Sequence, residues 1–305
     1  MRRLLALAAT LVLLFSGTAE AIVIVSPTPG TTVKPGDLVT LRVALGPNEI
    51  ATEVIVVSDG DPVTATFDGT HYVGQAKISR EGVGPDLLVA FAVLQGGGAS
   101  FADVAITIDP GELRTLSLNI PERMTFAGET AGTELRGLFE DGVVRDLSPV
   151  DTGTTYSTSD SQVVALHPLG IVQARANGTA TITATNRGRT TDVRVTVSIE
   201  ATDTNRIPSI TPGAEQTVKS EEIVTLSATA TDPDGDALEY VWEQLSGRVV
   251  TLHNPTSANP EFVAPRTSIA QELEFLVSAR DARGATTLPV LVRVHVVPVT
   301  PVGLN

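Results

Sequence analysis

Short runs in which apolar and polar residues alternate are the feature that most constrains the fold of this 305-residue chain. In one run, Val39, Leu41 and Val43 alternate with Thr40 and Arg42. A period of two places successive side chains on opposite faces, as in a half-buried β-strand. Similar runs recur along the chain, and turn sequences rich in Gly, Pro and Asp separate them. Short strands at this spacing predict an all-β protein built from sandwiches, without substantial helices.

The chain contains no cysteine, so disulfides cannot hold these sandwiches together. Each must rely on its own core, which is feasible near 90 residues because folding then buries about 60–65% of the surface. The strand pattern restarts after residues 109–111, Asp-Pro-Gly, and again after a short polar segment. We therefore predict three tandem immunoglobulin-like β-sandwiches, and few contacts across their boundaries. The predicted parts are sandwiches at residues 22–110, 111–200 and 207–298, a linker at 201–206 and a C-terminal tail at 299–305.

Residues 1–21 have the layout of a secretory signal peptide. A basic start, Met-Arg-Arg, precedes the apolar run 4–15, and Ala-Glu-Ala at 19–21 is a small-x-small cleavage sequence. The apolar run is too short to span a bilayer comfortably, although an uncleaved, membrane-anchoring start is the alternative interpretation. We expect an exported protein, in the extracellular space, on the cell surface or in the periplasm, with no membrane span after cleavage.

The charge balance narrows the classes of partner. The sequence has 35 acidic residues against 21 Lys and Arg, a formal net charge of −14 at pH 7. An acidic surface of this kind argues against nucleic acid and against anionic lipid as partners. It favours solubility and is compatible with divalent cations.

Three runs in the middle module follow the order of a known repeat. They are Tyr-Ser-Thr-Ser-Asp at 156–160, Gly-Ile-Val-Gln-Ala at 170–174 and Gly-Thr-Ala-Thr-Ile-Thr-Ala at 178–184. In this order they resemble the bacterial immunoglobulin-like group 2 repeat, with Tyr156 in place of the usual Trp. The resemblance implies a place among bacterial surface proteins, including adhesins, or a role as a spacer beside other domains.

The third module resembles the polycystic-kidney-disease (PKD) family of immunoglobulin-like domains from end to end. The resemblance rests on the run ATATDPDGDALEYVWEQLSG at 228–247, on Ala-Asn-Pro-Glu-Phe at 258–262 and on residues 278–285. It implies a sandwich in which Trp242, the single Trp, packs the core between the sheets. Thr-Val-Lys at both 32–34 and 217–219 further predicts that the first and third modules begin alike, with strand, turn and strand.

Catalytic motifs are absent from the sequence. There is no Cys nucleophile, no G-x-S-x-G elbow, no H-E-x-x-H and no Walker loop. The four His residues are scattered over the three modules, so we expect no enzyme unless a site is built across modules. The His residues are His71, His167, His253 and His295.

Carbohydrate binding is the main alternative among binding functions. Sugar sites usually need exposed aromatic rings, and aromatic residues make up only 4% of the chain. Because Trp242 and Tyr156 are required for the cores, Tyr72 and Tyr240 are the remaining candidates.

The turn Asp-Pro-Asp-Gly-Asp at 232–236 is the main candidate for a metal site. Asp232, Asp234 and Asp236 are spaced by two residues, so several hard oxygen atoms can converge there, and such oxygens suit Ca²⁺. In the PKD-like family, some members bind calcium through two acids of this turn, an acid after the penultimate strand and the polar start of the domain. The resemblance therefore implies Asn205, Asp232, Asp234 and Asp281 as calcium ligands. The alternative interpretation is a purely structural turn, because this sequence is an ordinary turn former.

Together these features predict a non-enzymatic, exported protein that acts in cell-surface adhesion or as a structural spacer or scaffold. We expect a protein or glycan partner at the cell surface. The alternative is an accessory subunit that binds substrate or carbohydrate for an extracellular enzyme system.

Overall fold

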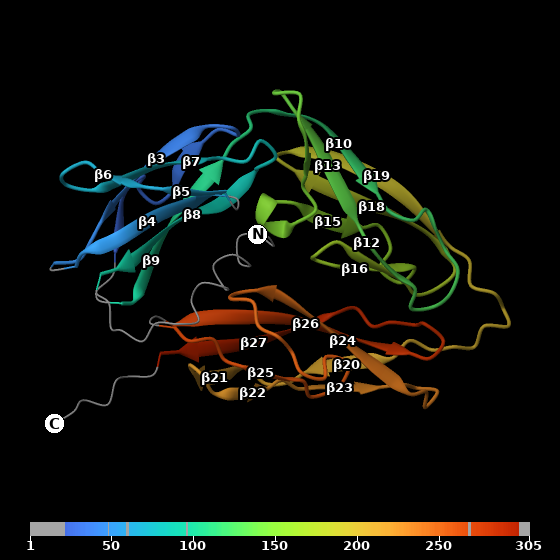
Figure 1. Ribbon diagram of the computed structural model, residues 1–305. Helices are drawn as coiled ribbons and strands as arrows, with labels where there is room; N and C mark the ends of the chain where they lie inside the picture. The colour runs from blue at the N-terminus through green and yellow to red at the C-terminus, as the bar shows by residue number, and fades with distance from the viewer. Residues whose placement is uncertain (1–21, 48, 59–60, 96, 268–269, 299–305) are drawn as a thin grey trace. The chain divides into compact units, whose positions relative to one another are not determined.

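The computed structural model describes residues 22–47, 49–58, 61–95, 97–267 and 270–298. The predicted signal peptide, residues 1–21, and the predicted tail, residues 299–305, lie outside these residues. Within them the regular elements are β-strands and one turn of 3-10 helix, η2 (Val150–Thr152), so the all-β prediction is confirmed (Figure 1). No helix of the described part of the chain combines the length and apolar character that a bilayer crossing requires.

The first sandwich packs two sheets against each other, with strand orders β1-β3-β7-β6 and β2-β9-β8-β4-β5. The predicted alternation is realised in β3, where Leu41 and Val43 are buried while Leu38 and Thr40 face solvent. These side chains meet apolar residues of β4, β8 and β9, such as Leu88, to form one core. The strands are β1 (Val23–Ser26), β2 (Thr31–Val33), β3 (Leu38–Ala44), β4 (Ala51–Ser58), β5 (Asp61–Thr64), β6 (Thr66–Phe67), β7 (Tyr72–Lys77), β8 (Gly84–Leu94) and β9 (Ala99–Ile108).

Residues 113–197 form three further sheets, with strand orders β10-β13-β14, β11-β19-β18-β15 and β12-β17-β16. In the hairpin β13–β14, the turn at residues 140–143 brings Asp141 close to Arg145 of β14. The strands are β10 (Leu113–Asn119), β11 (Arg123–Met124), β12 (Thr130–Gly132), β13 (Glu134–Phe139), β14 (Val144–Asp146), β15 (Thr155–Thr158), β16 (Val164–His167), β17 (Ile171–Ala174), β18 (Gly178–Asn186) and β19 (Arg189–Val197).

The third sandwich is built on the sheet β21-β27-β26-β24, together with the pairs β20-β23 and β22-β25. Trp242 lies in its core beside Phe262 and Phe275, and its indole N–H donates to the Ser257 carbonyl at 3.0 Å. The predicted core position of Trp242 is therefore confirmed. The strands are β20 (Ser209–Pro212), β21 (Gln216–Lys219), β22 (Ile223–Thr225), β23 (Ala228–Thr231), β24 (Leu238–Ser246), β25 (Glu261–Val263), β26 (Gln271–Asp281) and β27 (Val290–Val297).

One pairing is common to all three modules. An early strand pairs in parallel with the last strand of the module, as β2 does with β9, β11 with β19 and β21 with β27. The repeated Thr-Val-Lys sequence marks β2 and β21, and a turn leads from each into the next strand. The predicted common start of the first and third modules is thus confirmed.

The described residues form two compact units whose limits differ from the predicted module boundaries. The first unit runs to Ser117 and also contains Leu135–Thr154 and Asn186–Arg189. The second contains Leu118–Glu134, Thr155–Thr185 and the residues from Thr190 onward. The division into three modules stays a prediction of the sequence.

Candidate metal site

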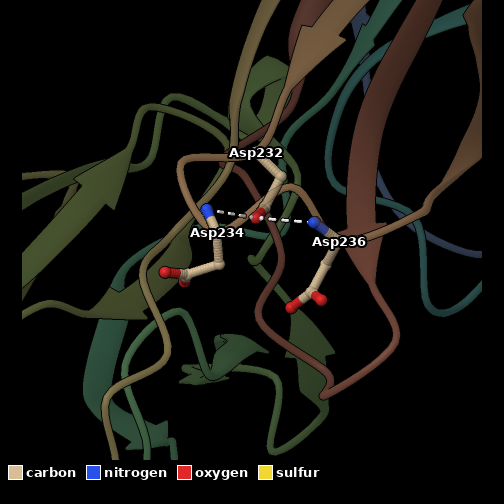
Figure 2. Close-up of side chains that lie close together, drawn as sticks. All are labelled: Asp232, Asp234 and Asp236. Atoms are coloured by element: carbon tan, nitrogen blue, oxygen red, sulfur yellow. Dashed lines mark hydrogen bonds between the residues drawn. The ribbon is translucent and has the colours of Figure 1, made fainter.

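The acidic turn between β23 and β24 is held by the first of its three aspartates. Asp232 Oδ1 accepts the backbone N–H groups of Asp234 at 2.8 Å and Asp236 at 3.2 Å (Figure 2). Each carboxylate offers one oxygen, and these oxygens lie within 4.8 Å of one another. Asp232 Oδ2 is buried and has no hydrogen-bond partner among the described residues. The turn therefore presents a buried anionic oxygen that protein donors leave unused.

Asp234 already has a cationic partner. Arg206 donates its backbone N–H and its Nε–H to the two Asp234 oxygens, each at 2.8 Å, and its Nη2 to the Pro233 carbonyl at 2.5 Å. The backbone donor, followed by the guanidinium, lowers the pKa of Asp234 below its usual value. A metal ion at this carboxylate would have to displace the Arg206 side chain or share the carboxylate with it.

Asp281 and Asn205 form a buried pair at the end of β26. Asp281 Oδ1 accepts the backbone N–H groups of Arg283 at 2.8 Å and Ala285 at 2.9 Å, while Oδ2 accepts Asn205 Nδ2 at 2.8 Å. Three donors therefore engage the two Asp281 oxygens and fix the turn that follows β26. Asn205 is 9% exposed, and its Oδ1 has no hydrogen-bond partner within the described ranges.

The four predicted ligands thus belong to one polar network. Asn205 contacts Asp281, its neighbour Arg206 contacts Asp234, and the Asp234 amide is bound by Asp232. A buried acceptor without a donor costs about 1–3 kcal/mol, and this network has two such oxygens, Asp232 Oδ2 and Asn205 Oδ1. Carboxylate and amide oxygens are the donors that Ca²⁺ prefers. The donor chemistry therefore fits a hard cation better than zinc or copper.

A pocket of about 530 Å³ opens beside Asn205 and gives it a route to solvent. Asp203 on its wall accepts the Asn205 backbone N–H at 3.0 Å and lies 3.7 Å from the Arg283 guanidinium. The remaining lining residues are Arg123, Thr125, Phe126, Ser198, Glu200 and Thr202.

The turn that Asp281 fixes also contacts residues of the middle module. The Thr286 N–H donates to the Gly128 carbonyl at 2.9 Å, and Gln173 Nε2 donates to the Thr286 carbonyl at 2.6 Å. A Cβ on Gly128 would lie 2.6 Å from the Ala285 Cβ, so only glycine fits there. Sequence reasoning missed this function of the turn, because the Asp-x-Arg-Gly-Ala pattern signals a turn but not what the turn contacts.

In both tyrosine candidates for sugar binding, the hydroxyl is hydrogen-bonded to the backbone and the ring packs against other side chains. The Tyr240 hydroxyl accepts the Ala230 N–H at 3.0 Å, and its ring packs on the core of the third sandwich. The Tyr72 hydroxyl donates to the Ala51 carbonyl at 3.3 Å, and its ring lies 5.1 Å from that of Phe67. Phe67 is 59% exposed, so it is the more accessible ring of that pair.

Comparisons with solved structures find weak similarities. A nucleoside hydrolase-related hypothetical protein from Saccharophagus degradans aligns at 23% identity over 31% of this chain and 26% of its own, with a TM-score of 0.27. The chain thus spans about a quarter of that protein's length. The fibronectin(III)-like modules of Clostridium thermocellum CbhA align at 13% identity over 91% of this chain and 94% of theirs, with a TM-score of 0.25. Domains 4 and 5 of the S-layer protein SbsC align at 17% identity over 61% of this chain and 100% of theirs, with a TM-score of 0.23. At these TM-scores the alignments carry no argument about fold or function.

No curated protein matches the chain significantly. The likeness of the middle module to the bacterial group 2 repeat stays a prediction. A family model does match the third sandwich, over residues 212–294, and its description is "K319L-like, PKD domain". This region contains the acidic turn, Trp242 and Asp281. The third sandwich is therefore a PKD-type domain, as the sequence resemblance predicted.

Proposed function

We propose that the chain is a non-enzymatic, exported structural protein that spaces or attaches other components at the cell surface, and that its third sandwich binds Ca²⁺. The observation that carries the calcium assignment is the pair of buried, unpartnered oxygens, Asp232 Oδ2 and Asn205 Oδ1, in one polar network. The spacer function is supported by the tandem sandwiches and by the PKD-type match at 212–294.

Ca²⁺ would be held by Asp232 and Asn205, with Asp234 or Asp236 as a further ligand from the same turn. It would neutralise the acidic turn and connect the start of the domain to the β23–β24 turn. Asp281 would then act mainly by holding Asn205 in place, because its own oxygens already accept three hydrogen bonds.

Trp242 offers a direct test, because it is the only Trp and lies in the core of the third sandwich. Its fluorescence reports the unfolding of this sandwich within the whole protein. Extracellular calcium sites typically have Kd values of about 10⁻⁴–10⁻³ M. At about ten times Kd, binding to the folded state adds about 1.4 kcal/mol. For a domain of this size, that gain should raise Tm by about 5–10 °C.

The expected result is a Trp242 unfolding midpoint that rises with millimolar Ca²⁺ relative to chelator. Asp232→Asn should abolish the rise, whereas Asp68→Asn, in a turn of the first sandwich, should leave it intact. Identical melting in Ca²⁺ and chelator would reject the calcium assignment. Protease treatment of intact cells tests the spacer function separately, since degradation of the chain is expected only if it reaches the outer surface.

The alternative is an accessory subunit that binds glycans, and one observation favours it. Phe67 is exposed and lies 5.1 Å from the Tyr72 ring, so the first sandwich presents an aromatic surface. Glycan binding that disappears in Phe67→Ala or Tyr72→Ala, while the protein stays folded, would support this alternative over the spacer function.

A further inference from the structure

Arg145 in β14 is a fully buried arginine, although arginine side chains are mostly exposed in folded proteins. Its side chain is 0% exposed, whereas its apolar neighbour Val144 in β14 faces solvent. The usual arrangement of apolar residues inside and charges outside is therefore reversed in this strand. A buried charge persists only when it is paired and hydrogen-bonded, so the partners of Arg145 explain its position.

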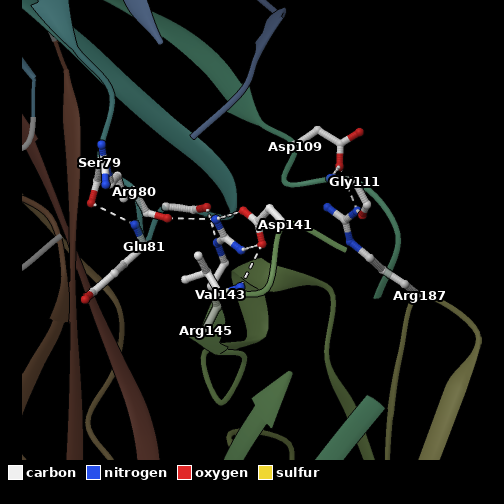
Figure 3. A network of polar contacts seen from close by, with 10 residues as sticks. Ser79, Arg80, Glu81, Asp109, Gly111, Asp141, Val143, Arg145 and Arg187 are labelled. Atoms are coloured by element: carbon white, nitrogen blue, oxygen red, sulfur yellow. Dashed lines mark hydrogen bonds and ion pairs between the residues drawn. The ribbon is translucent and has the colours of Figure 1, made fainter. Parts of the chain in front are cut away.

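Two sets of partners hold the guanidinium, as Figure 3 shows. Within its own hairpin, Nη1 and Nη2 bind the two Asp141 oxygens at 2.9 and 2.7 Å, and the Phe139 ring lies 5.2 Å away. From the first sandwich, the Gly82 carbonyl accepts Nε at 3.0 Å and the Arg80 carbonyl accepts Nη2 at 2.7 Å. Arg145 thus joins the hairpin β13–β14 to the loop between β7 and β8.

That loop is shaped to receive the hairpin. Gly82 packs so closely on Ile108 that a Cβ would lie 2.5 Å from the Ile108 Cδ1 atom. Gly84 has a φ of +82°, and a Cβ there would lie 3.5 Å from the Asp151 carbonyl oxygen. Glycine at both positions allows the loop backbone to approach η2 and to present its carbonyl groups to Arg145.

A second arginine holds the segment predicted as the first module boundary. Arg187 Nη1 donates to Asp109 Oδ1 at 2.8 Å and to the Gly111 carbonyl at 3.1 Å (Figure 3). Its guanidinium also lies 5.4 Å from the Phe139 ring, which Arg145 contacts as well. Polar contacts therefore cross the boundary predicted at 110/111, where the sequence indicated few.

We propose that the Arg145 contacts fix the hairpin β13–β14 to the first sandwich, so that the two unfold as one unit. These contacts of Arg145 with Asp141, Gly82 and Arg80 are called the Arg145 lock. If the hairpin separated from the loop at residues 79–84, the Arg80 and Gly82 carbonyls would lose a donor and the guanidinium would lose half of its acceptors. The boundary at 110/111 is then a fixed joint rather than a flexible hinge. This inference goes beyond the proposed function, because it holds with or without calcium and for any partner.

Hydrogen exchange in the full-length protein tests the lock. Arg145→Met removes the charge while keeping an unbranched side chain, and Arg145→Lys keeps the charge without the planar fork. Arg42→Met is the matched control, because Arg42 belongs to the first sandwich and forms an exposed ion pair with Asp68. Arg145→Met removes the charge-assisted hydrogen bonds to the Gly82 and Arg80 carbonyls, and bonds of this kind are the strong ones. Exchange at 79–84 and 134–147 should therefore rise about a hundredfold in Arg145→Met. Arg145→Lys should give an intermediate rise, and Arg42→Met less than about threefold.

The Trp242 unfolding midpoint should not change in these variants, which would show that the third sandwich stays folded. An equally small effect of Arg145→Met and Arg42→Met on exchange would overturn the proposal. Limited proteolysis of the wild type gives a measurement that does not depend on how the variants fold. The lock predicts resistance at residues 109–112, and nicking there while the flanking sandwiches remain folded would also overturn it.

Discussion

Replacing Asp281 should show that its carboxylate stabilises the third sandwich even without metal. Its oxygens accept three hydrogen bonds, from Asn205 Nδ2, Arg283 N and Ala285 N, at 2.8, 2.8 and 2.9 Å. The residue is 4% exposed, so water cannot easily replace the lost acceptor. Asp281→Ala leaves these donors unpaired, and hydrogen bonds to charged groups contribute about 1.5–3 kcal/mol each. Because losses within one network are not additive, we expect a total of about 3–5 kcal/mol.

The assay is urea unfolding of the full-length protein, followed by Trp242 fluorescence, with chelator present. Asp281→Asn keeps one acceptor oxygen and should lose about half as much stability as Asp281→Ala. Asp234→Ala is the control, because it removes a more exposed ion pair, and such pairs contribute about 0–1 kcal/mol. A loss below about 1 kcal/mol for Asp281→Ala would refute the structural function of this carboxylate. A large loss that appears only in Ca²⁺ would instead make Asp281 chiefly a metal ligand.

Three further changes test the packing and the electrostatics. Trp242→Ala should lower the free energy of unfolding by about 3–5 kcal/mol, the range for deleting a buried aromatic side chain, as measured by circular dichroism. A much smaller loss would place the indole at the surface. Gly128→Ala should lower the midpoint of Trp242 unfolding because its Cβ would meet Ala285, whereas Gly132→Ala, with open space around it, should not. Backbone hydrogen bonds, first from the His71 N–H, lower the pKa of Asp68 to about 2. Its stabilising effect is therefore present above its usual pKa and lost as the pH falls from about 4 to 2, so Asp68→Asn should flatten the acid unfolding curve in that window.

The part of the candidate site that lies close together in sequence could be predicted from the residues alone. Asp232 and Asp234 stand on one Pro-Gly turn, and a turn of this kind brings its own side chains together whatever surrounds it. The PKD-type resemblance added Asn205 and Asp281, which do form a buried hydrogen bond. The sequence did not reveal that the Arg206 guanidinium donates to the Asp234 carboxylate, or that backbone N–H groups donate to the Asp281 carboxylate. The Arg206–Asp234 contact joins segments 28 residues apart, and local sequence does not specify how such segments approach. The amides that bind Asp281 belong to its own turn, where the sequence signals a turn but not its hydrogen bonds.

The sequence by itself determined the strands, the core position of Trp242 and the strand-turn-strand start shared by the first and third modules, because each follows from a local pattern. The parallel pairing of β2 with β9 and of β21 with β27 came from the tertiary structure. Alternation decides which face of a strand is buried, and turn residues decide where strands end. Only the tertiary structure placed Arg145, because an arginine side chain is ordinarily exposed and nothing in the local sequence names its partners. Its burial is stable because Gly82 and Arg80, more than 60 residues earlier, supply carbonyl acceptors beside Asp141. Whether a charge can be buried depends on the groups that surround it in the folded protein, and only folding brings those groups together.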